Sequence, residues 1–400
     1  MGLGSVGGSL GRFWSVASGG IWLALAVIAG MVDVPDSYRP VIALLPELLA
    51  LLTALMAWRY RRSRLFLSTI ILVTSSVLVK GPLAAEVVEG GGLALAAFRV
   101  LFPINLLVLV FLRDRRVGHP HVLLCGLTVV LQPVAFGWLR SAVDADTAPV
   151  LVRSLTTPQV SLLVFLVATL VSALALAMRH GGFDIALVWV LVGGLVASHA
   201  NLGLQGVTMI LAASQITLLL SVIEHAYRLA FYDQLTGLPG RRALDSALQH
   251  LRGSYVVAMA DVDRFKRFND RFGHESGDQA LRMVAKVLRG VKGGGRAYRY
   301  GGEEFAILFQ DTDPASARVH LEEVREALAA RKFGVRAADR PRRKPERPNA
   351  EKSTTRSVKV TISIGLAGPG RHREKPADVL RAADRALYRA KKAGRNRVHE

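Results

Sequence analysis

Long apolar runs fill the chain as far as about residue 225, and they restrict it to a small set of folds. A helix that crosses the hydrocarbon core of a bilayer needs roughly 20 mostly apolar residues. Eight runs reach or approach that length, at about 13–32, 41–58, 65–82, 92–112, 121–139, 159–178, 184–200 and 203–223. The sequence therefore predicts an integral membrane domain over residues 1–223, a helical bundle of about eight transmembrane spans in contact with the lipid bilayer.

Charges in the short connections predict the orientation of this domain. Lysine and arginine favour the cytoplasmic ends of membrane helices. Arginines follow the second, fourth and sixth runs, and acidic residues occupy the alternate connections. The residues are Arg59, Arg61, Arg62, Arg64, Arg113, Arg115, Arg116 and Arg179 against Asp33, Asp36, Glu86, Glu89, Asp144 and Asp146. We expect a multi-pass protein of the bacterial inner (cytoplasmic) membrane, with both termini and the soluble domain in the cytoplasm.

Three polar side chains fall at membrane depth, where charge is costly and marks either a function or an internal pair. They are Glu47, Arg99 and Gln132. A Glu47–Arg99 ion pair and a ligand-sensing role are both open interpretations, and no motif names a ligand.

The formal net charge of +20 could indicate a nucleic-acid partner. Much of the excess, however, lies in the arginine clusters between apolar runs and in a basic stretch over about 337–359, so we predict no nucleic-acid binding. The basic stretch is expected to be a long loop, either solvated or touching anionic lipid headgroups. The single cysteine, Cys125, excludes an intramolecular disulfide.

From Asp233 onward the composition is that of a soluble domain. Hydrophobic spacing predicts helices over 241–251, 277–288, 314–330 and 376–393, and strands over 255–262, 297–300, 304–309 and 358–366. This order predicts an α/β (α+β) domain over 233–400, with a central, largely antiparallel sheet flanked by helices. Residues 224–232 contain no glycine or proline and are predicted to form a helical linker to it.

Carboxylates gather around one predicted hairpin of this sheet. Gly301-Gly302 marks the tight turn and Glu303-Glu304 follows at once, while the strand 255–262 runs into Asp261-Val262-Asp263. If the two strands are neighbours, three or four carboxylates share one sheet edge, which favours hard cations such as Mg²⁺. Two such ions would suit an in-line attack on phosphorus.

These residues belong to blocks that resemble the GGDEF family of diguanylate cyclases. The blocks are 233–242, 261–278, 299–305, 363–365, 383–388 and 390–396, in the order of the family, and they cover about 230–398. The resemblance implies a homodimer that condenses two GTP into cyclic di-GMP and two pyrophosphates, with Mg²⁺, or alternatively Mn²⁺, as cofactor. Control would come from the membrane domain.

The resemblance also implies a role for individual residues. Metal binding is expected of Asp261, Glu303 and the Val262 carbonyl, and catalysis of Glu303 and Glu304. Substrate binding is expected of Asn269 and Asp278 at guanine, and of Lys266, Gly301, Gly302, Lys391 and Arg395 at the phosphates. An inhibitory product site of the form Arg-x-x-Asp would fall on Lys292 and Gly295, so we predict weak or absent inhibition by cyclic di-GMP.

Other functions stay open at this point. A catalytically silent membrane receptor could use the GGDEF domain only to bind nucleotide, and a transporter could use it for regulation. A cyclase that makes a 3′,5′-cyclic mononucleotide is a third alternative. The chain ends shortly after Asn396, so we expect no EAL-type phosphodiesterase to follow.

Overall fold

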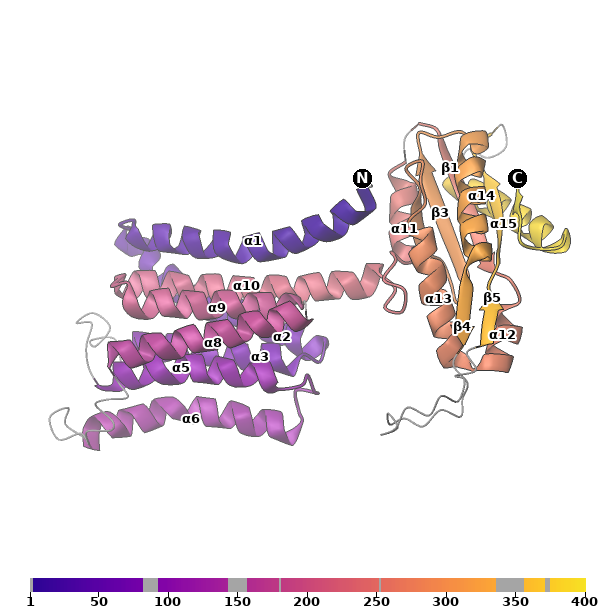
Figure 1. The fold of residues 1–400 in the computed structure, drawn as a ribbon. Helices are drawn as coiled ribbons and strands as arrows, with labels where there is room; N and C mark the ends of the chain where they lie inside the picture. The colour runs from indigo at the N-terminus through magenta and orange to yellow at the C-terminus, as the bar shows by residue number, and fades with distance from the viewer. Residues whose placement is uncertain are drawn as a thin grey trace, which may run out of the picture. The chain divides into compact units, whose positions relative to one another are not determined.

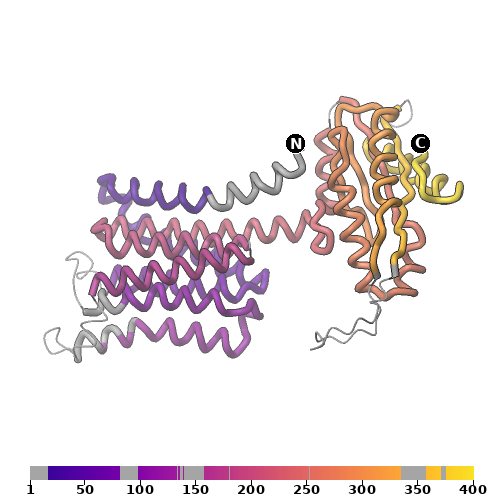
Figure 2. The backbone as a smooth tube through the Cα atoms, viewed as in Figure 1, coloured from indigo at the N-terminus to yellow at the C-terminus, as the bar shows by residue number. Residues whose placement is uncertain are grey.

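The structure is a computed structural model that describes residues 3–81, 93–142, 157–179, 181–251, 253–335, 356–370 and 375–400, and Figure 2 traces its backbone. Contacts divide the chain into two compact units. One unit is Ser9–Ala226, and the other is Tyr227–Glu400 together with Met1–Gly8. Most of the basic stretch over 337–359 lies outside the described residues, so its predicted role as a loop is not addressed.

The first unit is built of long helices, and each overlaps one of the predicted spans (Figure 1). They are α1 (Leu3–Met31), α2 (Arg39–Arg59), α3 (Ser63–Lys80), α5 (Leu93–Phe111), α6 (Pro120–Ala142), α8 (Pro158–Arg179), α9 (Gly182–His199) and α10 (Gly203–Phe231). A short 3-10 helix, η1 (Asp36–Tyr38), precedes α2.

Five helical segments are long and apolar enough to cross a membrane: Asp36–Arg59, Ser63–Lys80, Pro158–Arg179, Gly182–His199 and Gly203–Phe231. Shorter apolar segments are described at Ala17–Met31, Phe98–Phe111 and Pro120–Gln132. The figure of about eight spans therefore stays a prediction. The helices differ in how much of their surface is buried. About 72% of the most apolar stretch of α3 is buried, but only 22% of that of α2, which would leave α2 facing lipid.

Polar side chains join these helices in pairs. Lys80 contacts Glu47 at 2.8 Å and Gln132 exchanges hydrogen bonds with Asn105. Ser76 also donates to Glu47, at 2.7 Å. The possible Glu47–Arg99 pair is therefore wrong. Lys80 and Ser76 lie one helical turn apart on α3 and both contact Glu47 of α2, but spacing along the chain did not reveal that α2 and α3 face each other there.

The second unit has a five-stranded sheet in the order β2-β3-β1-β6-β7. The strands are β1 (Tyr255–Val262), β2 (Arg296–Arg299), β3 (Glu304–Gln310), β6 (Ile362–Ala367) and β7 (Val398–His399). All neighbours are antiparallel except β6 and β7, which confirms the predicted largely antiparallel sheet. A separate pair joins β4 (Lys332–Val335) to β5 (Arg356–Lys359).

Helices cover both faces of the sheet, and the central strand β1 is therefore buried on both sides. Val256, Ala258 and Ala260 pack in one core with α13 (His274–Leu288) and α14 (Pro314–Ala330). Val257 and Met259 pack in the other with α11 (Arg241–Gln249) and α15 (Pro376–Lys392). The period of two along β1 thus divides its side chains between two helix layers.

Several details differ from the sequence-based prediction, which did not include β4 or β7. Residues 358–366 are not one strand, since β5 ends at Lys359 and β6 begins at Ile362. A short helix, α12 (Phe265–Phe272), precedes α13, which itself begins earlier than predicted. The signal for α12 was present, because Phe265, Phe268 and Phe272 recur at helical spacing. Phe268 stacks on Phe265 and packs at a tilt against Phe272.

Candidate active site

The end of β1 and the β2–β3 turn lie side by side. Register pairs Asp261 with Glu304, and the Val262 N–H donates a hydrogen bond to the Glu303 carbonyl at 3.3 Å. The sheet therefore brings together Asp261, Glu303 and Glu304, as predicted from the assumption that the two strands are neighbours.

Asp261 is almost buried, and its Oδ2 lies 2.8 Å from the Lys391 Nζ. Burial raises the pKa of Asp261 above its ordinary value, although Lys391 opposes this shift. Burial also raises the pKa of Glu303, and repulsion from Asp261 adds to it. Two carboxylates thus share a place where negative charge is unfavourable without a further cation.

Lys391 reaches Asp261 because α15 packs unusually close to β6. A Cβ on Gly365 of β6 would lie 1.9 Å from the Leu387 backbone nitrogen, so only glycine permits this approach. Lys391 follows Leu387 by about one helical turn and is therefore carried to the end of β1.

The three carboxylates that meet here agree with the expected cluster of three or four. Asp263, the fourth candidate, lies near enough to raise the pKa of Asp261 but is engaged in hydrogen bonds of its own. It accepts hydrogen bonds from Thr361 Oγ1 at 2.7 Å, Ser363 Oγ at 2.6 Å and the Asn396 N–H at 3.1 Å. Alternation along a strand sends Asp261 and Asp263 to the same face, but the chain leaves the sheet after Val262 and turns Asp263 towards β6.

Sequence reasoning did not show that Asp263 contacts the turn that contains Arg395, a residue predicted to bind phosphate. Arg395 and Asn396 both have left-handed backbone angles, with φ of 66° and 44°. Such angles are unfavourable for residues other than glycine unless neighbouring contacts hold them. Asp263 therefore fixes the turn that carries Arg395.

The donor set fits Mg²⁺. Within the described ranges, no group of three or more His, Cys, Asp or Glu side chains is arranged to hold a metal. Mg²⁺ is usually held by one or two carboxylates together with substrate phosphates and water. Asp261 and Glu303 supply two carboxylates, and their raised pKa values indicate a site that a cation would stabilise.

The glycine turn is tied to the start of the domain by Arg299. This side chain donates to the Gly301 carbonyl at 3.2 Å, to the Gly302 carbonyl at 2.6 Å and to Asp233 at 2.8 Å. Gly302 is exposed, and a Cβ there would meet nothing within 4 Å. The backbone at Gly302 is thus open to a ligand while Arg299 holds the turn from behind.

Asp233 is held by local hydrogen bonds and by the ion pair with Arg299. Its Oδ1 also accepts hydrogen bonds from the Thr236 N–H and hydroxyl, at 2.8 and 2.6 Å. These bonds and Arg299 lower the pKa of Asp233 despite the opposing effect of burial. Sequence reasoning did not single out Arg299, although its place two residues before Gly301 offered a signal.

The predicted guanine-binding residues lie on the helix pair α12–α13. Asn269 Oδ1 is buried without a hydrogen-bond partner among the described residues. A Cβ on Gly277 would lie 1.9 Å from that atom, so glycine is needed for α13 to approach it. Asp278 is the next residue and is exposed, and Lys266 is exposed on the first turn of α12. An orphaned amide beside a carboxylate fits a ligand that carries both donors and acceptors.

The positions of the inhibitory motif, which the sequence predicts to be missing, lie in the segment before β2. Lys292 forms an exposed ion pair with Glu323 at 3.4 Å. A Cβ on Gly295 would lie 2.7 Å from Phe309 and 2.9 Å from Val291. An aspartate at residue 295 would therefore require the local packing to shift.

Comparison with known proteins assigns this unit to a family. Residues 230–397 match the family described as diguanylate cyclase, GGDEF domain. The response regulator PleD of Caulobacter vibrioides is 35% identical over 184 residues, which are 44% of this chain and 37% of PleD. The diguanylate cyclase DgcP of Pseudomonas aeruginosa is 34% identical over 186 residues, 44% of this chain and 25% of DgcP.

Among solved structures, the coiled coil and GGDEF domain of DgcB from Caulobacter crescentus, in complex with c-di-GMP, is 33% identical. The match has a TM-score of 0.38 and covers 44% of this chain and 88% of that chain. The chain spans only about a third of PleD and a quarter of DgcP. By its sequence match and its paired carboxylates, the part of the chain from residue 230 to residue 397 is a GGDEF domain.

Proposed function

We propose that this protein is a membrane-bound diguanylate cyclase that condenses two GTP into cyclic di-GMP and two pyrophosphates. One observation carries the proposal above the others. Asp261 and Glu303 form an electrostatically strained pair beside the open backbone of Gly302, within a domain that matches the GGDEF family. A silent receptor that only binds nucleotide would not need two carboxylates held together at that cost.

Each residue of the site has a distinct task in this proposal. Asp261, Glu303 and the Val262 carbonyl would hold Mg²⁺, or alternatively Mn²⁺, which neutralises phosphate charge when bound. Asn269 and Asp278 would select guanine, since an amide and a carboxylate match its edge. Phosphate oxygens would accept hydrogen bonds from Lys266, Lys391, Arg395 and the Gly301-Gly302 backbone.

The reaction makes one phosphodiester bond for each GTP consumed. The 3′-oxygen of one nucleotide attacks the α-phosphorus of the other, the bond from that phosphorus to the bridging oxygen breaks, and pyrophosphate leaves. Glu304, next to the pair, is the candidate acceptor of the 3′-hydroxyl proton. Holding both nucleotides in line supplies much of the rate.

Two half-sites are needed, so we propose a homodimer. Support comes from the end of α10, where Ile223 and Tyr227 are about half exposed and stand one helical turn apart. An apolar stripe of this kind is suited to pairing with a second copy of the same helix. The helix α10 contributes residues to both units, and 224–232 is the proposed linker through which the membrane domain 1–223 would control the cyclase domain 233–400.

The orientation is part of the proposal. Five helices are long and apolar enough to cross a membrane, and the arginine-rich connections favour the cytoplasmic side. With eight spans, the GGDEF domain and both termini would lie in the cytoplasm of a bacterial cell, where GTP is available.

Turnover of GTP by the purified full-length protein with Mg²⁺ tests the function directly. We expect cyclic di-GMP, identified by mass, and none from the Glu303→Ala variant. Failure of both the full-length protein and a forcibly dimerised 226–400 fragment, with GTP still bound, would favour the silent receptor. A product with the mass of a cyclic mononucleotide would favour the third alternative.

Product inhibition should be weak. The positions of the inhibitory motif hold Lys292 and Gly295, and the latter is packed against Phe309. Cyclic di-GMP added to the enzyme should leave initial rates nearly unchanged. Strong inhibition at micromolar product would show that another surface binds it.

A further inference from the structure

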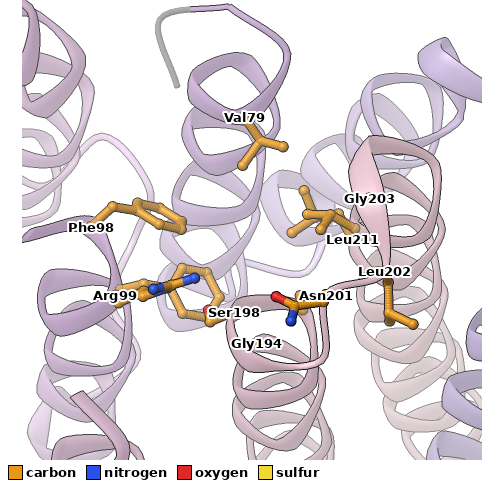
Figure 3. A pocket seen from close by; sticks show the side chains of 12 residues that line it. Val79, Phe98, Arg99, Gly194, Ser198, Asn201, Leu202, Gly203 and Leu211 are labelled. Atoms are coloured by element: carbon orange, nitrogen blue, oxygen red, sulfur yellow. The ribbon is translucent and has the colours of Figure 1, made fainter. Parts of the chain in front are cut away.

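A small cavity lies inside the helical bundle, between α3, α5, α9 and α10 (Figure 3). Its volume is about 40 Å³. Apolar side chains such as Phe98, Val207 and Leu211 form most of its wall. Polar groups come from three residues, Arg99, Ser198 and Asn201. Figure 3 shows Arg99 and Asn201 reaching into this space from opposite sides.

Arg99 differs from the other interhelical basic side chains, because no ion pair with it is found among the residues that the structure describes. Its Nε is buried and receives no hydrogen-bond acceptor from any residue that the structure describes. By contrast, Arg64 contacts Asp184 at 2.9 Å and Lys80 contacts Glu47 at 2.8 Å. An arginine stays charged, and an unpaired charge within a membrane bundle is expensive. Arg99 therefore calls for an anion.

The cavity limits the size of that anion. One water molecule needs roughly 10–15 Å³ of such volume, so about 40 Å³ admits a carboxylate group with a few carbon atoms but not a whole phospholipid headgroup. A guanidinium fork matches a carboxylate with two parallel hydrogen bonds. The Ser198 hydroxyl and the Asn201 amide offer further donors, and the apolar wall suits a hydrocarbon body.

Two residues in the wall of the cavity have left-handed backbone angles. Asn201 has a left-handed backbone with φ of 47°, and Gly203 follows with φ of 65°. A Cβ on Gly194 would lie 2.3 Å from the Phe102 ring, so glycine is needed for the close packing beside the cavity. Left-handed residues in a ligand wall are a recurrent feature of binding sites.

We propose that this cavity binds the carboxylate of a small apolar acid, with Arg99 as its counter-ion. Val79 and Phe98 lie near the ends of α3 and α5, and Leu202 lies in the connection between α9 and α10, on the side that the arginine pattern assigns to the outside. The ligand enters from that side or from the outer leaflet. It contacts the first turns of α10, the helix that continues to Phe231 at the edge of the GGDEF domain.

Binding to the full-length protein in lipid nanodiscs tests this proposal without reference to cyclase activity. Sodium hexanoate, which reaches the cavity from water, and sodium decanoate, which partitions into the bilayer, are the two probes. Hexanol and decanol are their neutral counterparts. We expect at least one acid to raise the unfolding temperature by several degrees, and its alcohol to have little effect. The acid that succeeds identifies the route of entry.

Matched variants make the result specific. Arg99→Gln should weaken acid binding at least tenfold, and Asn201→Ala or Ser198→Ala should weaken it severalfold. Arg39→Gln, at an exposed arginine that pairs with Asp36 on α2, should leave binding unchanged. Equal responses to acid and alcohol, or an undiminished response in Arg99→Gln, would overturn the proposal.

A carboxylate of the chain itself is the competing occupant. Glu86 and Glu89 precede α5 and lie outside the described residues. If the wild type ignores both acids and only the Glu86→Gln/Glu89→Gln variant responds, an internal pair occupies the cavity and the proposed external ligand is excluded.

Discussion

A nearly buried aspartate meets a basic side chain in each half of the molecule, and the two pairs are almost equal in length. Arg64 and Asp184 lie 2.9 Å apart within the helical bundle, and Lys391 and Asp261 lie 2.8 Å apart in the GGDEF domain. Arg64 also donates to the Leu109 carbonyl at 2.7 Å and lies 4.5 Å above the Phe183 ring. Its charge and its donors are satisfied, so the pair fastens α3 to α9.

The surroundings of Asp261 are different. Glu303 adds a second carboxylate, and about a third of the Lys391 side chain is exposed. In the proposed reaction, Lys391 would be a counter-ion that shifts from Asp261 to the phosphate oxygens of the substrate. A short ion pair alone does not distinguish a structural contact from an active site. A local excess of charge of one sign indicates an active site.

The largest expected effect that separates the two pairs is on catalysis. Asp261→Asn should lower cyclic di-GMP formation by a factor of about 1000 or more, because a lost metal carboxylate removes several kcal/mol of transition-state stabilisation. Thermal unfolding of the GGDEF domain should change little. The rate of product formation, measured by mass, checks the loss, and Asp245→Asn on the exposed face of α11 is the control. Retention of a tenth of the activity would contradict the metal assignment.

Breaking the bundle pair should instead affect stability. Arg64→Met leaves Asp184 buried without a partner, which typically costs about 3–5 kcal/mol. We expect a marked fall in the unfolding temperature of the full-length protein in nanodiscs. Asp36→Asn, which removes the exposed pair with Arg39, should change it by a degree or two at most. Similar stability of Arg64→Met and wild type would refute the fastening role.

A smaller effect on catalysis is expected from the contact between Asp233, at the start of the GGDEF domain, and Arg299, next to the Gly301-Gly302 turn. Asp233→Asn keeps the shape of the side chain but weakens its bond to Arg299, a charge-assisted contact worth about 1–2 kcal/mol. Cyclic di-GMP formation should fall about tenfold while binding of GTP is nearly unchanged. A change in GTP affinity with an unchanged maximal rate would argue that this contact does not position the turn.

The smallest effect concerns the metal-free domain and has a defined sign. Asp261 and Glu303 have pKa values raised above the ordinary 3.8 and 4.5. At a pH above these ordinary values, the two carboxyl groups bind more protons in the folded state than in the unfolded state. Their contribution to the free energy of unfolding therefore falls as pH rises through the raised pKa values. Glu303→Gln should therefore raise the unfolding temperature slightly at neutral pH without metal. Scans of the wild type and the variant in EDTA at several pH values check this, and a stabilisation by Glu303→Gln that does not grow as pH rises would contradict it.

The sequence was informative to different degrees in the two halves. In the GGDEF domain, apolar alternation and the Gly301-Gly302 signal located the strands, and the neighbouring order of β1 and β3 then placed Asp261 beside Glu304. Local patterns could not show that Asp263 turns away, because that depends on hydroxyl donors about a hundred residues later. In the bundle, apolar runs located the helices but not their neighbours. The Lys80–Glu47 contact depends on helix packing, which an apolar run of uniform composition does not encode.

The uninterrupted course of α10 has a geometric consequence. From Gly203 to Phe231 the helix has no break, so a residue inserted near Glu224 rotates everything after it by about 100°. Seven inserted residues restore the angular phase to within about 20°. A series of insertions should therefore give cyclase activity that rises and falls with the helical repeat, and the signal carried by α10 would be an angle rather than a distance.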